Sequence, residues 1–355
     1  MVRESDHIVA ETAARIFADL ADPQTVNAAR DRRWMEPLWR ALSDAGLTLA
    51  WVPEALGGAG ASLADGFAVI GVAGRYALPV PLAETLLAGW MLSSAGIPVS
   101  PGALTVAPVR PRDRITLGAD GCLAGRAAGV SFAADAHWIA VLAQDDARDV
   151  VALVTASDCS IGEGANLAGD PHGAVSFDGV KPRACAPTPQ GVDQTALALM
   201  GATARSVQIA GALEAILAMS VRYANERVAF ERPIGKFQAV QQNLARLAGE
   251  TAAALAAAGS AADSLAQSRI DPDSLLLEVA SAKIRCGEAA ADGAAIAHQV
   301  HGAIGFTSEH ILHRFTLRML GWRDDFGSES HWAAALGGHI AKRGADRFWP
   351  MLAAR

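Results

Sequence analysis

The feature that most constrains the fold is a set of three long helical runs in the second half of the chain. They cover about residues 195–230, 238–268 and 273–300 and are rich in alanine and leucine. The runs are separated only by Pro233 and by Asp271-Pro272, and proline has no backbone N–H to continue a helix. Because short connections make neighbouring helices antiparallel, residues 191–355 are predicted to form an antiparallel helical bundle.

Helical periodicity also marks the first part of the chain. Apolar residues over 8–20 and 34–42 recur at steps of three and four, which is typical of amphipathic helices. Further apolar runs over 63–78 and 83–95 predict two more helices. Residues 1–97 are therefore predicted to form an N-terminal helical domain.

Residues 98–190 have a different texture, in which proline and glycine are frequent and apolar runs are short. These runs are 115–117, 138–142, 150–154 and 174–177. Asp120-Gly121 and Asp178-Gly179 are turn dipeptides, the first of them placed between two short runs as in a hairpin. The segment predicts a small antiparallel β domain. The predicted fold class is thus α+β, mainly α, with this β domain in the middle.

Composition excludes several classes of protein. The chain has 355 residues and a formal net charge of −7, whereas nucleic acid and anionic membranes call for a basic surface. With 51% apolar residues it has enough apolar surface to fold. The longest uncharged stretch, 85–109, is interrupted by three prolines, so no membrane helix is expected. Four cysteines stand singly, which favours a cytoplasmic protein with free thiols.

One candidate site is the turn between the first two long helices. It reads Arg227-Val-Ala-Phe230-Glu231-Arg-Pro-Ile-Gly-Lys-Phe237-Gln238. A guanidinium is a planar fork of donors that suits a diphosphate, and the two phenyl rings offer faces for stacking. The amide of Gln238 adds a group that can bond a nucleotide edge. On spacing alone, the same residues also fit a plain helix hairpin in which Arg227 caps carbonyl groups.

A second candidate is the glycine turn at the end of the third helix, Gln299-Val-His-Gly302-Ala303-Ile-Gly305. Bare glycine amides can approach a cofactor closely. Helix ends use glycine in the same way without any ligand, so the turn by itself leaves both interpretations open.

Together these segments resemble the acyl-CoA dehydrogenase family, which pairs Arg-x-x-Phe-Gly-x-Pro-Ile-x-x-Phe-Gln with a later Gln-x-x-Gly-Gly-x-Gly. Glu231 and Ala303 stand where that family usually has glycine. The helical, β and helical order of the chain matches as well. The resemblance implies a flavoenzyme that desaturates an acyl-CoA thioester: a carboxylate removes the α proton while a hydride passes to FAD. Carried over by position, the FAD-binding residues are Arg227, Phe230, Phe237, Gln238, Gln299 and Gly302.

The positions at which the family places its catalytic glutamate hold no carboxylate here. The register before the Gly-Ser pair 327–328 contains Phe326, and the alternative register, 22 residues before Tyr223, contains Gly201. Asp325 and Glu329 are the neighbouring carboxylates that could replace the base, although both also fit a solvated cluster at a helix start. The ring-binding stretch Thr-Glu-Pro-x-x-Gly-Ser-Asp is also missing, since residues 105–113 read Thr-Val-Ala-Pro-Val-Arg-Pro-Arg-Asp.

We therefore expect the non-basic small subunit of a heteromeric acyl-CoA dehydrogenase, in which a larger subunit supplies the ring pocket and the base. The resemblance implies an electron-transfer flavoprotein as electron acceptor and a dimer of heterodimers. By analogy with certain bacterial members, it also implies lipid or steroid catabolism. Two alternatives stay open: a homo-oligomeric enzyme that uses Asp325 or Glu329, and a non-catalytic binding or scaffolding paralogue.

A metal site is not expected. His298 and His301, and likewise His310 and His313, share a helix face at i, i+3 spacing. There is no His-Glu-x-x-His pattern, and Glu309 stands beside the pairs and not within them. Histidines at helix ends and interfaces account for the same pattern.

Overall fold

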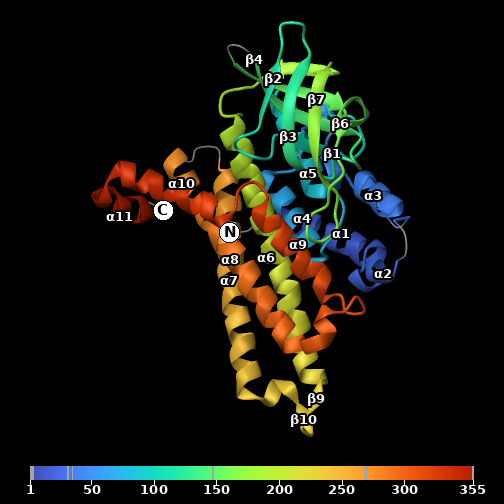
Figure 1. Ribbon diagram of the computed structural model, residues 1–355, viewed down its shortest axis with the longest axis vertical. Helices are drawn as coiled ribbons and strands as arrows, with labels where there is room; N and C mark the ends of the chain where they lie inside the picture. The colour runs from blue at the N-terminus through green and yellow to red at the C-terminus, as the bar shows by residue number, and fades with distance from the viewer. Residues whose placement is uncertain (1–3, 30–31, 34, 146–147, 268–270, 354–355) are drawn as a thin grey trace. The chain divides into compact units, whose positions relative to one another are not determined.

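The computed structural model describes residues 4–29, 32–33, 35–145, 148–267 and 271–353 (Figure 1). It divides into two compact units. The sheet unit consists of Met1–Ala21, Asp31–Ile70 and Pro79–Gly201. The bundle unit consists of Asp22–Arg30, Gly71–Leu78 and Ala202–Arg355.

The first ninety or so residues are helical, as their periodicity predicts. The helices are α1 (Glu4–Leu20), α2 (Pro23–Ala28), α3 (Met35–Asp44), α4 (Leu63–Arg75) and α5 (Leu82–Ser94). Phe17 of α1 and Leu38 and Leu42 of α3 are fully buried, which accounts for the apolar stripe in each helix. Nearly every residue of α5 is buried, because this helix packs against strands of the sheet.

The middle segment forms a sheet with strand order β6-β7-β3-β2-β4-β5-β8, and β1 also pairs with β4. The strands are β1 (Leu104–Ala107), β2 (Arg114–Leu117), β3 (Leu123–Ser131), β4 (Trp138–Asp145), β5 (Arg148–Thr155), β6 (Ser160–Ile161), β7 (His172–Val180) and β8 (Ala184–Pro187). Asp120-Gly121 lies in the β2–β3 hairpin as predicted, with Leu117 opposite Leu123 and Gly121 at φ +75°.

Two expectations about this segment are wrong. The sheet is mixed and not purely antiparallel, because β1 and β2 both run parallel to β4. Asp178-Gly179 lies inside β7 and not in a turn: Asp178 pairs with Ala124 of β3 next to a register shift. Cross-strand pairing and a local bulge override the turn preference of that dipeptide.

The bundle unit contains the predicted long helices and a short hairpin. From residue 202 on, its α-helices and strands are α6 (Gln194–Glu226, which begins in the sheet unit), β9 (Val228–Ala229), β10 (Arg232–Pro233), α7 (Gln238–Ala266), α8 (Pro272–His301), α9 (Leu312–Asp324), α10 (Glu329–Arg343) and α11 (Ala345–Ala353). Asp271 is the N-cap of α8 and accepts a hydrogen bond from the N–H of Ser274. The predicted first helix ends at Glu226 and not at 230, because the chain turns there into the β9–β10 hairpin.

Small side chains set how closely the bundle helices approach. Ala254 and Ala258 of α7 and Ala289 and Ala290 of α8 are buried in the shared core. A Cβ on Gly211 of α6 would lie 2.1 Å from the carbonyl oxygen of Gly71, so only glycine fits this crossing. Helix α6 is long and apolar enough to cross a membrane, but 83% of its apolar window is buried inside the protein, as in a core helix.

Candidate functional site

The turn after α6 is a tight hairpin that presents an aromatic ring to solvent. Ala229 pairs with Arg232 across it, and the two residues between them, Phe230 and Glu231, have φ values of +52° and +66°. Two positive φ values are characteristic of a type I′ turn, which favours glycine. Phe230 is 89% exposed. Position 231 therefore keeps the left-handed backbone, although it holds glutamate where the resembled family usually has glycine.

The predicted residues around this hairpin are exposed or half-buried, and two of their rings are in contact. Arg227 donates its backbone N–H to Tyr223 at 2.8 Å, while its side chain is exposed. Phe237 is half-buried and meets the edge of Phe230 at a centroid distance of 6.2 Å. The guanidinium of Arg232 lies 4.2 Å from the Phe237 centroid. The sequence analysis did not single out Arg232, whose place beside Phe237 depends on the pairing of Arg232 with Ala229 in the folded hairpin.

The second predicted segment lies at the end of α8. Gln299 is exposed, and Gly302 takes φ +65° and ψ −147°, a conformation that disfavours any side chain. Phe306 follows in a short 3₁₀ turn, Gly302–Phe306. It is 73% exposed and stacks on the ring of His298 at 4.3 Å.

A group of stacked rings links the ends of α6 and α8. Tyr223, one turn before Arg227, stacks on His301 with a centroid distance of 4.5 Å and an interplanar angle of 27°. His310 contacts both, at 4.7 Å from His301 and 6.3 Å from Tyr223. Since His301 directly precedes Gly302, the two predicted segments begin from neighbouring helix ends.

The pKa values of His301 and His310, and of the neighbouring His298, are all lowered, which favours the neutral form of each ring. Burial is the main cause that lowers the pKa of His298, His301 and His310 below the ordinary value, and neighbouring histidines lower it further. Arg222 adds to the effect on His310. A hydrogen bond to the carbonyl of Ala297 acts in the opposite direction on His301.

The turn between α9 and α10 holds the position expected for a base. Phe326 is 4% exposed, has φ +54°, and its carbonyl accepts a hydrogen bond from the indole of Trp332 at 3.0 Å. Asp325 is buried and forms an ion pair with buried Arg205. Glu329 is partly exposed, with its Oε1 3.5 Å from the Nε of Arg323. The base position thus contains a buried ring.

Two buried cations, Lys283 and Arg205, lie next to this turn. Nζ of Lys283 donates to the carbonyls of Trp322 and Arg323, which are in the last turn of α9. Nη1 of Arg205 donates to the side-chain oxygen of Gln208 at 2.6 Å. The carboxylate of Asp325 therefore lies among groups that fix its place.

The remaining predicted positions are built into the core. Thr105, where the resembled family begins its ring-binding stretch, is buried in β1 and donates from its hydroxyl to the carbonyl of Ser131 at 2.7 Å. Gly201 is buried in α6. Among the residues that the structure describes, no group of three or more His, Cys, Asp or Glu side chains is placed to hold a metal ion. All four cysteines are free thiols.

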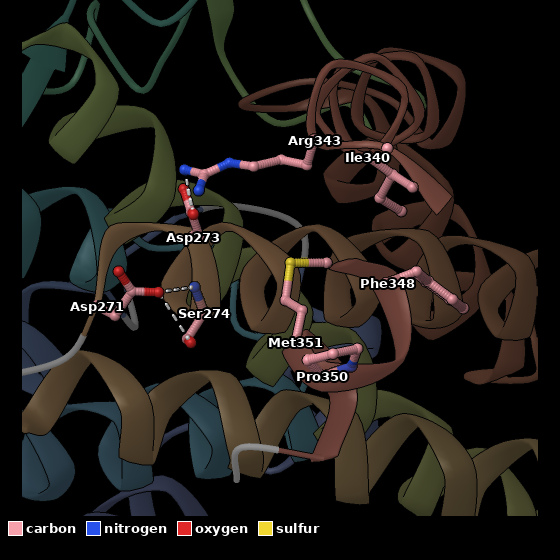
Figure 2. A pocket seen from close by; sticks show the side chains of 9 residues that line it. Asp271, Asp273, Ser274, Ile340, Arg343, Phe348, Pro350 and Met351 are labelled. Carbon is pink, nitrogen blue, oxygen red and sulfur yellow. Dashed lines mark hydrogen bonds and ion pairs between the residues drawn. The ribbon is translucent and has the colours of Figure 1, made fainter. Parts of the chain in front are cut away.

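A pocket of about 330 Å³ lies elsewhere in the bundle unit, between the start of α8 and helices α10 and α11 (Figure 2). Its acidic groups already have partners. Asp273 pairs with Arg343, and Asp271 accepts hydrogen bonds from Ser274. None of the predicted site residues lines this pocket.

Two family models match the chain: "Acyl-CoA dehydrogenase, N-terminal domain" over residues 3–98 and "Acyl-CoA dehydrogenase, C-terminal domain" over 191–328. The chain is 31% identical over 322 residues to acyl-CoA dehydrogenase IpdE2 of Mycobacterium tuberculosis, covering 90% of this chain and 92% of that protein. It is 31% identical over 315 residues to acyl-CoA dehydrogenase FadE27 of the same organism, covering 81% and 83%.

Solved structures are also similar. One is the ChsE4-ChsE5 complex from Mycobacterium tuberculosis, with a TM-score of 0.82, 26% identity and coverage of 97% of this chain and 99% of that chain. Another is a variant of the Tcur3481-Tcur3483 steroid acyl-CoA dehydrogenase, with a TM-score of 0.82, 27% identity and coverage of 96% and 98%.

Proposed function

Because this chain belongs to the acyl-CoA dehydrogenase family, we propose that it is the small, non-basic subunit of a heteromeric enzyme that desaturates an acyl-CoA thioester. FAD is the cofactor of this family and therefore of this chain. One observation carries the proposal: the exposed hairpin that would hold FAD is present, while the base position contains the buried ring of Phe326.

The exposed residues fit the diphosphate and adenosine part of FAD. Arg227 would bind the diphosphate through charge-assisted hydrogen bonds, and Phe230 would provide a face for stacking. Gln238 and Gln299 would supply amide groups, and Gly302 a backbone without a side chain in the way. All five residues are exposed, so FAD could reach them without any rearrangement of buried side chains. Phe237 would support the ring of Phe230 from the side.

When bound, FAD supplies the acceptor for the hydride that leaves the β carbon. The residues of this chain bind and orient the nucleotide tail, and the aromatic rings keep water away from it. They do not move the α proton in the proposed mechanism, because a phenyl ring has no proton-accepting atom at position 326. The carboxylate that takes this proton then belongs to the larger subunit.

The solved relatives support a partner of this kind. The ChsE4-ChsE5 structure contains two different chains, and the name of the Tcur3481-Tcur3483 protein includes the word steroid. We infer a larger acyl-CoA dehydrogenase subunit as partner, a dimer of heterodimers in the cytoplasm, and a bulky lipid or steroid thioester as substrate. An electron-transfer flavoprotein would reoxidise the enzyme.

The test is to purify the chain alone and together with a larger acyl-CoA dehydrogenase chain that has both the ring-binding stretch and a glutamate base. We expect the chain alone to be colourless and inactive. The co-purified complex should be yellow and should reduce an electron acceptor when acyl-CoA is added. A yellow, active homo-oligomer of this chain would refute the proposal.

A homo-oligomeric enzyme is the second candidate, and the partial exposure of Glu329 is the observation that favours it. It predicts that Glu329→Gln or Asp325→Asn lowers turnover by orders of magnitude while FAD stays bound. The ion pair of Asp325 with Arg205 favours a structural part for that residue. The third candidate is a binding or scaffolding paralogue, which predicts that neither flavin nor CoA thioester binds even when the partner is supplied.

A further inference from the structure

We propose that the stacked rings of Tyr223, His301 and His310 hold the two nucleotide-binding segments in place, and that they do so only while both histidines are neutral. The inference rests on the proposed function, since it concerns the same grip on FAD. These three residues are positioning residues: they lie behind the exposed groups and act through them.

The geometry places the rings between the two segments. The backbone carbonyl of Tyr223 accepts a hydrogen bond from the N–H of Arg227 at 2.8 Å, so the Tyr223 ring lies one helical turn before the point at which the chain leaves α6. His301 is 3% exposed and is the residue before Gly302. Their parallel stack at 4.5 Å therefore joins the base of the hairpin to the base of the glycine turn. His310 closes the group from the start of α9.

The hydrogen bonding of His301 shows why its charge matters. Nδ1 lies 2.8 Å from the carbonyl oxygen of Ala297, and a carbonyl only accepts, so Nδ1 carries the proton in the neutral ring. Nε2 is then an acceptor; it is buried and has no partner among the described residues. Protonation would place a second N–H and a positive charge at this buried atom, at a large desolvation cost.

The groups that face these rings oppose protonation. His301 faces His298 on α8, while His310 faces His301, His313 and Arg222 of α6. Each of these neighbours lowers the pKa of the ring it faces, in addition to the larger effect of burial. At low pH, protonation of both His301 and His310 would therefore place two positive charges within one stack of rings. Repulsion between these charges favours separation of the rings. Once the rings separate, the stack no longer holds the hairpin next to the glycine turn.

The expected consequence is a grip on FAD that weakens as the pH falls. Because burial, the neighbouring histidines and Arg222 depress the pKa of these rings, the stabilisation is complete above the ordinary histidine pKa of 6.5 and is lost as the pH falls through the lowered values. The loss should be about tenfold in affinity for each pKa unit by which the free and the bound form differ.

The experiment measures flavin retention of the complex with its larger subunit between pH 5.5 and 8, by the fluorescence of released flavin. His301→Phe keeps a stacking ring but cannot be protonated, so it should retain flavin and lose most of the acid sensitivity. Tyr223→Phe should behave like the wild type, and Tyr223→Leu should weaken retention at every pH. His137→Gln, an exposed histidine of the sheet unit, is the matched control.

A wild-type pH profile in His301→Phe would overturn the inference, even if Tyr223→Leu fails to fold. So would undiminished retention in a folded Tyr223→Leu. Either result would leave the proposed function intact, provided that flavin is bound at neutral pH. Absence of flavin from the wild-type complex at every pH would refute the proposed function and this inference together.

Discussion

The guanidinium of Arg205 and the carboxylate of Asp325 form an ion pair inside the bundle unit. Nε and Nη2 of Arg205 lie 3.0 and 2.9 Å from the same oxygen, Oδ2, and the two side chains are 2% and 8% exposed. The pair ties α6 to the turn between α9 and α10, where the family places a catalytic carboxylate. In this chain the carboxylate next to that position in sequence, Asp325, is paired with a buried guanidinium.

Replacement of Asp325 by Asn should destabilise the protein strongly, because the charge of Arg205 would stay buried without the negative charge of Asp325. Removal of one member of a buried pair costs about 3–5 kcal/mol. Urea unfolding of the purified protein measures the effect. Glu36→Gln breaks the exposed Arg40–Glu36 pair, whose side chains are 68% and 80% exposed, and should change the unfolding free energy by less than about 1 kcal/mol. Equal effects of the two variants would contradict the prediction.

Removal of both charges should be tolerated better than removal of one. The double variant Arg205→Met with Asp325→Leu leaves no buried charge from this pair and should recover much of the stability that Asp325→Asn loses. The comparison is made from the same urea curves. A double variant less stable than Asp325→Asn would contradict the prediction, because the pair would then stabilise the fold by more than the mutual neutralisation of its charges.

Lys283 should make stability rise with pH in alkaline solution. Burial lowers the pKa of this ammonium to about 8 from 10.5, against the attraction of Asp325 and Glu329. Between these two values the unfolded chain binds more protons than the folded one, so the free energy of unfolding increases with pH. Lys283→Met should remove this rise, whereas Lys342→Met, at an exposed lysine, should keep it. Parallel pH curves for wild type and Lys283→Met would exclude the effect.

Glu231→Gly should stabilise the hairpin. A side chain at φ +66° is disfavoured by about 1–2 kcal/mol, and glycine relieves this cost at the expense of a more flexible unfolded chain. Thermal unfolding should therefore shift upward modestly. Gly121→Ala provides the reverse control, because that glycine has φ +75° and open space around it. Its stability should decrease, and shifts of the same sign in both variants would disprove the backbone argument.

Arg227→Ala should release flavin from the complex without loss of fold, because the side chain is exposed. Hydrogen bonds to a charged group contribute about 1.5–3 kcal/mol, which corresponds to a loss of roughly 10–100-fold in affinity. Fluorescence titration with FAD measures it, and circular dichroism checks the fold. Arg40→Ala, in an exposed ion pair of the sheet unit, is the control and should bind flavin normally.

The helices were predictable because their signals are local. Proline and an aspartate cap set the start of α8, and the predicted range 273–300 lies within Pro272–His301. The hairpin was not predicted, since its Phe230-Glu231 turn lacks the glycine that marks a type I′ turn. The glycine motifs pointed to the two exposed segments, whose role stays a prediction.

The contacts behind these segments were beyond sequence reasoning. Arg205 and Asp325 are 120 residues apart in the chain, and nothing in the spacing of either residue indicates the other. The stack of Tyr223 on His301 likewise depends on which helix ends meet in the folded bundle. The sequence pattern places the histidines at i, i+3 spacing but does not indicate that the rings of His298 and His301 stack on Phe306 and Tyr223.

The left-handed backbone at Phe326 bears on how readily this chain could acquire a base of its own. A glutamate introduced there would enter a buried position whose ring now lies 5.9 Å from the guanidinium carbon of Arg205, and would place a second carboxylate next to buried Asp325. Two neighbouring buried carboxylates do not both ionise readily, because each negative charge raises the pKa of the other group. Conversion of this chain into a catalyst with a base at position 326 would therefore require coordinated changes at several sites, which favours retention of the proposed division of labour between two subunits.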